Sequence, residues 1–455
     1  MKKADIQGKI LQGNSIFTLK TLQNMKPKII DQRTDDLFRS RLSSQINLSH
    51  ELVRLAETID WEGLHTHLSQ LFTAGSGQPP KPVRLIVGLL ILQQTYGCSD
   101  EEVVQRWIEN PYWQYFCGYD FLQTDFPAHP TSLTRWRERL GKEQMEKILA
   151  YTIQLGVGTK TIEASSLKDV TVDTTVMPKN VTYPTDVKLL HRGIEKIVAL
   201  AKRNQISLRQ SYKRVAKRAL VQAGRYAHAR QMKRFRKEER RLRTWLSRLH
   251  REMRRKAKAL YEPLEPLIDK LLNQRRSDKD KLYSLHEPSV SCIAKGKAHK
   301  KYEFGSKVSL TVTNREGFAL SLQAYVGNPH DSKTLATAFK ETERMTGVKV
   351  ENGYVDRGYR GHGIEGTSVM VTGSRRLSRT LKKRLKRRQA IEPVIGHMKS
   401  EGKLGRCYLK GQVGDEYQVV LSGIGHNIRQ ILRRLKAFLS KLFSCRPHGL
   451  IGQLT

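Results

Sequence analysis

Apolar residues recur every three or four positions along the first third of the chain, which is the period of amphipathic helices. The segment 83–97, VRLIVGLLILQQTYG, reads as a buried helix, and SDEE at 99–102 is a capping box that starts another helix. A further short helix is predicted at 132–141. The pattern therefore predicts an all-α domain over residues 48–160.

The period changes to two beyond this domain, as expected for strands. The sequence GNPHD at 327–331 predicts a turn into a helix, in which Asp331 resembles the cap. Strand patterns lie at 167–178, 301–314, 317–327 and 348–356. We predict an α/β core in two parts, 161–187 and 286–438, with an insertion between them.

The insertion, residues 188–285, returns to helical spacing and is strongly basic. Between Arg225 and Lys258 the chain has fifteen Lys or Arg against three Glu, with one apolar stripe. We predict a long helical hairpin with a basic outer face. A solvated coiled-coil face is one interpretation. A nucleic-acid surface is the other, and it is favoured because so many like charges repel one another unless phosphates lie nearby.

The excess of positive charge is a property of the whole chain and not of the insertion alone. Its 455 residues include 82 Lys plus Arg and 43 Asp plus Glu, so the formal charge is +39. This excess favours a polyanionic partner, since neutralised phosphates release their counterions. A basic segment, 1–47, and an irregular tail, 439–455, are predicted to flank the domains.

Neither a membrane-span-length apolar run nor an N-terminal apolar segment is found, so we expect an intracellular protein that does not enter a membrane. The cysteines lie far apart and form no CxxC pair, which predicts reduced structural thiols and leaves carboxylates to hold any catalytic metal. These cysteines are Cys98, Cys117, Cys292, Cys407 and Cys445.

Three acidic residues stand where strands and a helix can converge. Asp173 lies on the first predicted strand, Asp356 ends a later one, and Glu392 lies in a C-terminal helix. Three such carboxylates can surround two divalent cations that activate a nucleophile and stabilise the leaving oxygen at phosphorus. Their oxygen ligands suit Mg²⁺, for which Mn²⁺ would substitute. The alternative for Asp356 is an ordinary Asp-Arg-Gly turn with a solvated ion pair.

The neighbourhood of Glu392 carries a helical pattern. Arg388, Glu392, Gly396 and Lys399 share one face of a predicted helix, so two cations flank the carboxylate. They would offset phosphate charge and help to keep Glu392 ionised. Pro393 disfavours α geometry at Glu392, which predicts a kink or a helix start there.

Three segments, taken in order, resemble the DDE transposases of bacterial insertion sequences, closest to the insertion sequence five group. They are VDTTVMPKNVTYPTD (172–186), GYVDRGYRG (353–361) and RRQAIEPVIGHMKSEGKLGRCYLKG (387–411). The resemblance covers roughly residues 30 to 440. It implies an α/β ribonuclease H-like catalytic core, interrupted by the long basic helical insertion and preceded by the all-α N-terminal domain.

The same resemblance implies that Asp173, Asp356 and Glu392 are the catalytic, metal-binding triad. Arg388 and Lys399 match the basic positions of the family's C-terminal pattern, whereas Leu385 replaces the tyrosine found in related families. The rival ligands weighed are Asp169, Asp186, Asp331 and Glu365. The remaining DNA contacts expected are Arg135, Arg137 and Arg139 in a recognition-like helix, Arg357, Tyr359 and Arg360 beside Asp356, and Asn180 and Tyr183 in the first segment.

These features predict a DNA transposase that binds the terminal inverted repeats of its element, cleaves double-stranded DNA and joins a 3′-hydroxyl to target DNA. Pairing two ends requires a homodimer or higher oligomer, and the expected location is the prokaryotic cytoplasm and nucleoid. Two alternatives remain at this point. One is a nuclease of the same fold without strand transfer, and the other is an architectural or degenerate DNA-binding protein without catalysis.

Overall fold

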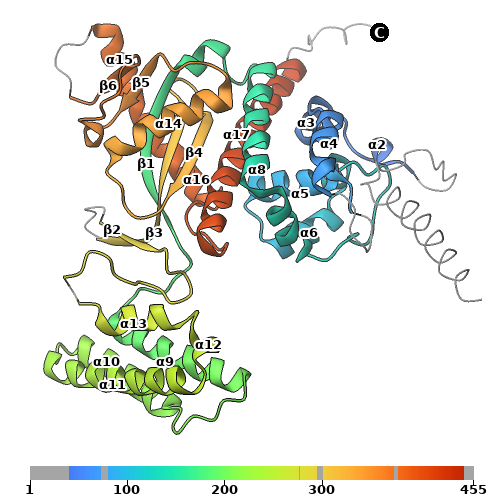
Figure 1. Cartoon of the computed structure of the whole chain (residues 1–455). Coiled ribbons are helices and arrows are strands. Elements are labelled where there is room, and N and C mark those ends of the chain that lie inside the picture. Colours follow the sequence, from blue (N-terminus) through green and yellow to red (C-terminus); the bar gives the residue numbers. More distant parts are fainter. Residues whose placement is uncertain (1–39, 73–79, 276, 295–300, 374–377, 445–455) are drawn as a thin grey trace, which may run out of the picture.

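The computed structural model describes residues 40–72, 80–275, 277–294, 301–373 and 378–444. They form a helical N-terminal region, a mixed sheet with its helices, and a helical bundle inserted after the first strand (Figure 1). Most of the predicted basic segment 1–47 lies outside the described residues, and Leu42–Gln45 forms the short helix α2. No helix in the described part of the chain is long and apolar enough to cross a membrane.

The N-terminal region is all helical, as the apolar spacing predicts. Gly97 ends the buried helix α5 in the left-handed conformation, and the capping box of Ser99 and Glu102 is present. The helix predicted at 132–141 breaks at Gly141, where φ is 64°, but the chain resumes as helix immediately. The helices are α3 (Glu51–Thr58), α4 (Trp61–Leu68), α5 (Val83–Tyr96), α6 (Asp100–Glu109), α7 (Pro111–Phe116) and α8 (Ser132–Gly158).

The sheet is six-stranded and has β1 near its centre. The strand order is β2-β3-β1-β5-β6, with β4 also paired to β3. β1 is antiparallel to β3 and parallel to β5, so the sheet is mixed. The four predicted strand segments are confirmed. The strands are β1 (Asp169–Pro178), β2 (Ser291–Ala294), β3 (Tyr302–Thr313), β4 (Ala319–Tyr325), β5 (Asn352–Val355) and β6 (Ser368–Val371).

Four helices accompany the sheet: α14 (Asp331–Thr346), α15 (Arg379–Arg387), α16 (Ile391–Ser400) and α17 (Gly411–Ser444). The assignment of Asp331 as the helix cap is wrong, because the N-cap of α14 is His330, whose side chain accepts the N–H of Ser332. The irregular tail predicted from residue 439 begins as helix, because α17 continues to Ser444. Residues 445–455, including Cys445, lie outside the described residues. The other four cysteines are free thiols, as predicted.

Helix α17 joins the N-terminal helices to the sheet, and one buried apolar cluster runs through both (Figure 1). The fully buried Asn427 of α17 donates to the Thr152 hydroxyl of α8 and to the carbonyl of Ala319 in β4, whose N–H it accepts. A Cβ at Gly425 would lie 2.5 Å from the carbonyl oxygen of Gln94 in α5. Glycine therefore allows α17 and α5 to pack with their backbones in contact.

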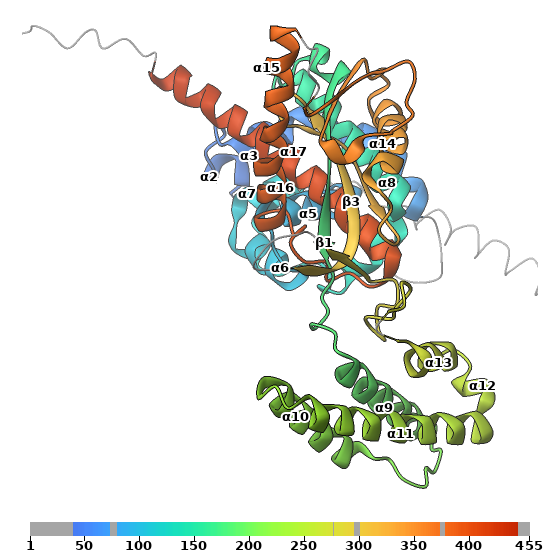
Figure 2. The ribbon, with the colours of Figure 1, turned by 90° about the vertical axis from the view of Figure 1, so that its left-hand side faces the viewer.

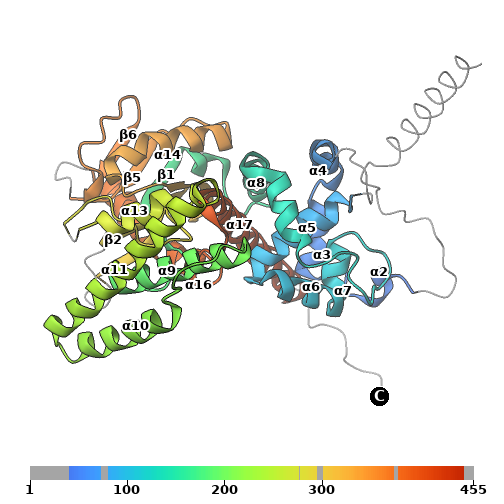
Figure 3. The ribbon, with the colours of Figure 1, turned by 60° about the horizontal axis from the view of Figure 1, so that its bottom comes forward.

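The insertion is a separate bundle with its own apolar core (Figures 2 and 3). Two of its helices, α10 and α11, form the predicted hairpin, but α9 and α13 pack against α11, so the unit is larger than a hairpin. The buried side of α11 includes Leu242, Leu246 and Leu249, and its cations lie outside. The helices are α9 (Asp186–Arg203), α10 (Lys213–His228), α11 (Met232–Lys256), α12 (Lys258–Tyr261) and α13 (Glu265–Asn273).

A buried ion cluster holds the two chain segments that connect the insertion to the core. Lys179, directly after β1, pairs with Asp415 of α17 at 2.5 Å and with Glu287, which follows the insertion, at 3.4 Å. Its Nζ also donates to the carbonyl of Gly411, and the hydroxyl of Ser306 in β3 donates to Asp415. All three charged side chains are at most 5% exposed, so their charges are balanced within the cluster and not by solvent.

Replacing Lys179 by methionine should destabilise the protein more than an exposed substitution would. Two buried carboxylates would lose their cation, which costs about 3–5 kcal/mol of unfolding free energy. Denaturant unfolding measures the loss, and Lys349→Gln, a change at an exposed lysine, is the control. A Lys179→Met protein as stable as that control would contradict a stabilising role of the buried ion cluster.

Candidate active site

The parallel pairing of β1 with β5 places two of the predicted catalytic carboxylates side by side. Thr171 lies opposite Tyr354 in the register, and the same offset carried two residues further brings Asp173 next to Asp356. Asp356 directly follows the last residue of β5 and begins the 3₁₀ turn Arg357–Tyr359. One carboxylate thus lies within β1 and the other directly follows the neighbouring strand β5.

Asp173 is the more deeply placed of the two. Its side chain is 22% exposed, against 50% for Asp356. Burial raises the pKa of Asp173 to about 6, although the backbone N–H of Thr174 and the Arg388 guanidinium favour its ionised form. The nearby carboxylates of Asp356 and Asp331 raise that pKa further. Such a group gains from any cation that replaces its lost hydration.

Arg388 lies between the two aspartates. Its Nη1 is 3.6 Å from Oδ2 of Asp173, and its Nη2 is 3.9 Å from Oδ1 of Asp356. Its side chain is only 10% exposed, in a 3₁₀ turn between α15 and α16. Both pairs are longer than ordinary hydrogen bonds, so the guanidinium acts mainly through its charge.

Glu392 follows Arg388 by four residues, in the first turn of α16. The helix starts at Ile391, which agrees with the helix start predicted from Pro393. Glu392 is exposed and makes no hydrogen bond or ion pair to the described residues, and Asp173, Asp356 and Glu392 do not form a group whose ligand atoms all lie within 4.8 Å of one another. Because a 3₁₀ turn holds Arg388, the face predicted for Arg388, Gly396 and Lys399 is not one uninterrupted helix. Lys399 is half-buried.

Asp331 lies closer to the site than its sequence position indicates. Its Oδ1 accepts a hydrogen bond of 2.8 Å from the hydroxyl of Thr174 and pairs with Nζ of Lys307 at 2.5 Å. A Cβ at Gly358 would lie 2.9 Å from Oδ2 of Asp331, so glycine makes room for this carboxylate. Sequence reasoning missed Lys307 and Thr174, because nothing local marks a lysine or threonine of a strand as a partner of a distant helix.

The other rival ligands lie apart from the pair. Asp169 accepts hydrogen bonds from Asn352 and Arg384, and Asp186 accepts one from Gln274 at the base of the insertion. Glu365 is an exposed loop residue with no bond to the described residues. These contacts give Asp169 and Asp186 structural roles.

Several exposed cations lie near the site. The predicted DNA contact by Tyr359 is wrong, because its side chain is buried. Tyr359 is 1% exposed and packs in the main core, where no base can stack on its ring. Arg357 and Arg360 beside it are exposed. Helix α15 buries none of its residues and carries six Lys or Arg: Arg379, Lys382, Lys383, Arg384, Lys386 and Arg387.

The recognition-like helix also needs a correction. Arg137 is 5% exposed and binds Asp100 through both guanidinium nitrogens, at 2.9 and 2.5 Å. This ion pair connects α8 to the start of α6, and because the Arg137 side chain is buried, it cannot reach a phosphate. Arg135 and Arg139 are exposed. Asn180 and Tyr183 are exposed too, in the segment that leads from β1 into the insertion.

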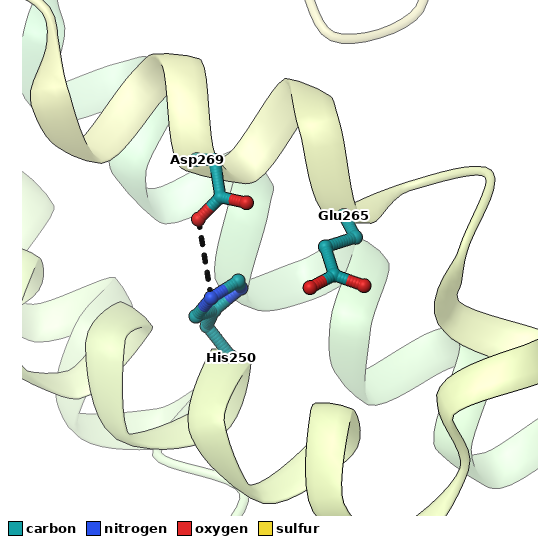
Figure 4. Close-up of side chains that lie close together, drawn as sticks. All are labelled: His250, Glu265 and Asp269. Carbon is teal, nitrogen blue, oxygen red and sulfur yellow. Dashed lines mark ion pairs between the residues drawn. The ribbon is translucent and has the colours of Figure 1, made fainter.

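A second group of side chains with metal-ligand chemistry lies in the insertion. His250, Glu265 and Asp269 are the three residues in the described part of the chain whose ligand atoms all fall within 4.8 Å of one another. Nε2 of His250 is 3.2 Å from Oδ1 of Asp269, and this ion pair is drawn in Figure 4. Arg254 pairs with Glu265 at 2.9 Å. The four residues form two ion pairs between α11 and α13, which explains the cluster as a helix-to-helix contact.

Comparisons with known proteins agree with this architecture. Residues 40–139 match the family described as Transposase domain (DUF772), and residues 340–432 match the family described as Transposase DDE domain. The uncharacterized protein ORF8 in nfe locus of Rhizobium meliloti is 44% identical over 207 residues, which are 46% of this chain and 100% of that protein. No solved structure matches.

Both matched families are transposase domains. The chain belongs to the DDE transposases of bacterial insertion sequences. A domain of this kind acts on DNA by phosphoryl transfer and depends on a divalent metal. The donor set fits such an ion, since Asp173 and Asp356 offer hard oxygen ligands on adjacent strands and already lie against a cation, Arg388.

Replacing Asp173 by asparagine should stabilise the metal-free protein at pH 7.5. Asp173 ionises near pH 3.8 when exposed and near 6 in the fold, so the folded state binds more protons between these values. Stability therefore falls as the pH rises through that window, and the ionised group costs about 1–3 kcal/mol above it.

Denaturant unfolding in EDTA at pH 7.5 and at pH values below 3.8 measures this effect. The gain from Asp173→Asn should disappear at the lower pH, where both side chains are neutral. Glu351→Gln, at an exposed carboxylate paired with Lys168, is the matched control. A variant less stable than wild type at pH 7.5 would show that Asp173 is well stabilised as an anion.

Proposed function

We propose that this protein is a DNA transposase that binds the terminal inverted repeats of its insertion sequence, cuts a strand there and transfers the 3′-hydroxyl to target DNA. The observation that supports it most is the pair of carboxylates, Asp173 and Asp356, on adjacent parallel strands with Arg388 between them. The strand order, with β1 central, antiparallel β3 on one side and parallel β5 and β6 on the other, supports a ribonuclease H-like core.

In this proposal Asp173, Asp356 and Glu392 hold Mg²⁺, or Mn²⁺ in its place. The bound ions would activate the attacking water or hydroxyl and stabilise the leaving oxygen. The N–H of Thr174 donates to Oδ1 of Asp173 and thereby leaves Oδ2 oriented toward Arg388. Glu392 approaches from α16, whose first turn follows directly from the turn that holds Arg388.

The cations around the site supply the DNA contacts of the proposal. Helix α15 exposes all six of its cations to solvent, and Arg357 and Arg360 follow Asp356, so phosphates near the cut meet positive charge. Arg135 and Arg139 of α8, together with the basic insertion, are proposed to hold the element ends. Synapsis of two ends requires at least a dimer, and membership of the insertion sequence five group belongs to the same proposal.

Cleavage and joining of labelled DNA that carries the flanking ends of the gene tests this function. Mg²⁺ or Mn²⁺ should give cuts at the ends and then joined products, and EDTA should abolish both. Asp356→Asn should lower the rate at least about a hundredfold while DNA binding persists, because only the metal site is lost.

Glu351→Gln removes an exposed acid of the same sheet and should retain the wild-type rate. Cuts without joined products would establish a nuclease of this fold instead. Binding without any metal-dependent cut would favour an architectural protein in which the carboxylates are structural.

A further inference from the structure

A cavity of about 1080 Å³ opens where the insertion meets the core. Its walls come from α9, from the segment that leads out of β1, and from the segment that returns from the insertion. Figures 1 and 2 show these two connecting segments running side by side between the bundle and the sheet. The Nζ of Lys196 in α9 donates to the carbonyl of Leu285 at 2.6 Å, so the walls are tied to each other.

The cavity is strongly cationic. Six Lys or Arg line it against a single acid, Glu195, which pairs with Arg192 at 2.8 Å. Three of the cations, Lys202, Lys213 and Arg406, make no hydrogen bond or ion pair to the described residues. Free cations that converge on one cavity leave a charge that an anionic ligand would neutralise.

Aromatic rings stand among these cations. Tyr183 and Tyr283 both line the cavity and pack on Phe304 of β3, with ring centroids 5.3 and 5.4 Å away. Tyr183 is nevertheless 60% exposed, among the largest exposures of any apolar or aromatic side chain in the described residues. A ring held in place by one neighbour and open on its other side is a stacking platform for a planar group.

We propose that this junction cavity binds an unpaired stretch of a DNA strand, with a base stacked on Tyr183 and phosphates on Lys202, Lys213 and Arg406. The inference rests on the proposed function, since it needs DNA at the neighbouring catalytic site. The volume is close to that of small-ligand sites, about 300–1,000 Å³, which suits one or two nucleotides. Combined rings and cations are the usual composition of sites for single strands.

The position of the cavity relative to the catalytic pair fixes which nucleotides reach it. Asn180, at its rim, follows Asp173 by seven residues along the extended chain, which corresponds to roughly 23 Å. A strand that leaves the cut with duplex spacing covers this length in about seven nucleotides. The unpaired segment is therefore expected near that distance from the cleaved phosphate.

Binding of the full-length protein in EDTA tests the proposal without requiring catalysis. The probes are a fluorescent duplex with a single-stranded extension and the blunt duplex of the same sequence. Wild type should bind the extended DNA about tenfold more tightly, as one stacked base allows. Tyr183→Leu should abolish this preference, and Tyr183→Phe, which keeps the ring, should retain it.

A matched pair of charge variants separates the cavity from the general basic surface. Lys202→Gln should lower the affinity for the extended DNA more than the affinity for the blunt duplex. Arg255→Gln, on the exposed end of α11, should leave the ratio of the two affinities unchanged. A thiothymidine placed about seven nucleotides from the cut should crosslink to the peptide that contains Tyr183 or Tyr283.

The outcomes distinguish this inference from the proposed function. Equal binding of both probes by wild type, or an unchanged preference in Tyr183→Leu, would show that the cavity does not bind an unpaired strand. The transposase proposal would not be affected by that result. Failure of wild type to bind either DNA would overturn both.

Discussion

The pairing of β1 with β5 brings two carboxylates, Asp173 and Asp356, close together. Their repulsion must be offset by positive charge, and the elements around the sheet supply it. Asp173 is partly buried and lies beside Asp356, whose carboxylate destabilises the ionised form of Asp173. Arg388 supplies the compensating charge, and its place depends on the turn between α15 and α16. The guanidinium between the two acids thus compensates part of their mutual repulsion.

This arrangement relates the fold to the chemistry. The carboxylates come from strands, which place them rigidly, whereas Glu392 comes from α16, which connects by a short turn to the exposed basic helix α15. Entry of divalent ions between the aspartates would compete with Arg388 for the same oxygens. DNA bound along α15 would then lie next to α16, the helix that carries Glu392.

Much of the fold could be predicted from the sequence, because periodicity reports on single elements. The strands at 167–178 and 348–356 and the helix ended by Gly97 were predictable for that reason. Burial of Arg137 and Tyr359 was not, since it depends on partners that the fold brings from elsewhere, such as Asp100. An arginine in a recognition-like pattern and a tyrosine beside a candidate catalytic acid look the same in sequence whether they face DNA or the core.

The candidate site was predictable only in part. The adjacency of Asp173 and Asp356 requires strand register, which a resemblance could imply but no local pattern contains. Iron-directed cleavage tests the central claim most directly, because Fe²⁺ in the metal site reduces added hydrogen peroxide to hydroxyl radicals that cut the nearby polypeptide backbone, while ascorbate regenerates Fe²⁺. The account predicts fragments from cuts near Asp173, Asp356 and Glu392 together, suppressed by excess Mg²⁺. Cuts confined to the surroundings of His250 and Asp269, or absent at either aspartate, would contradict it.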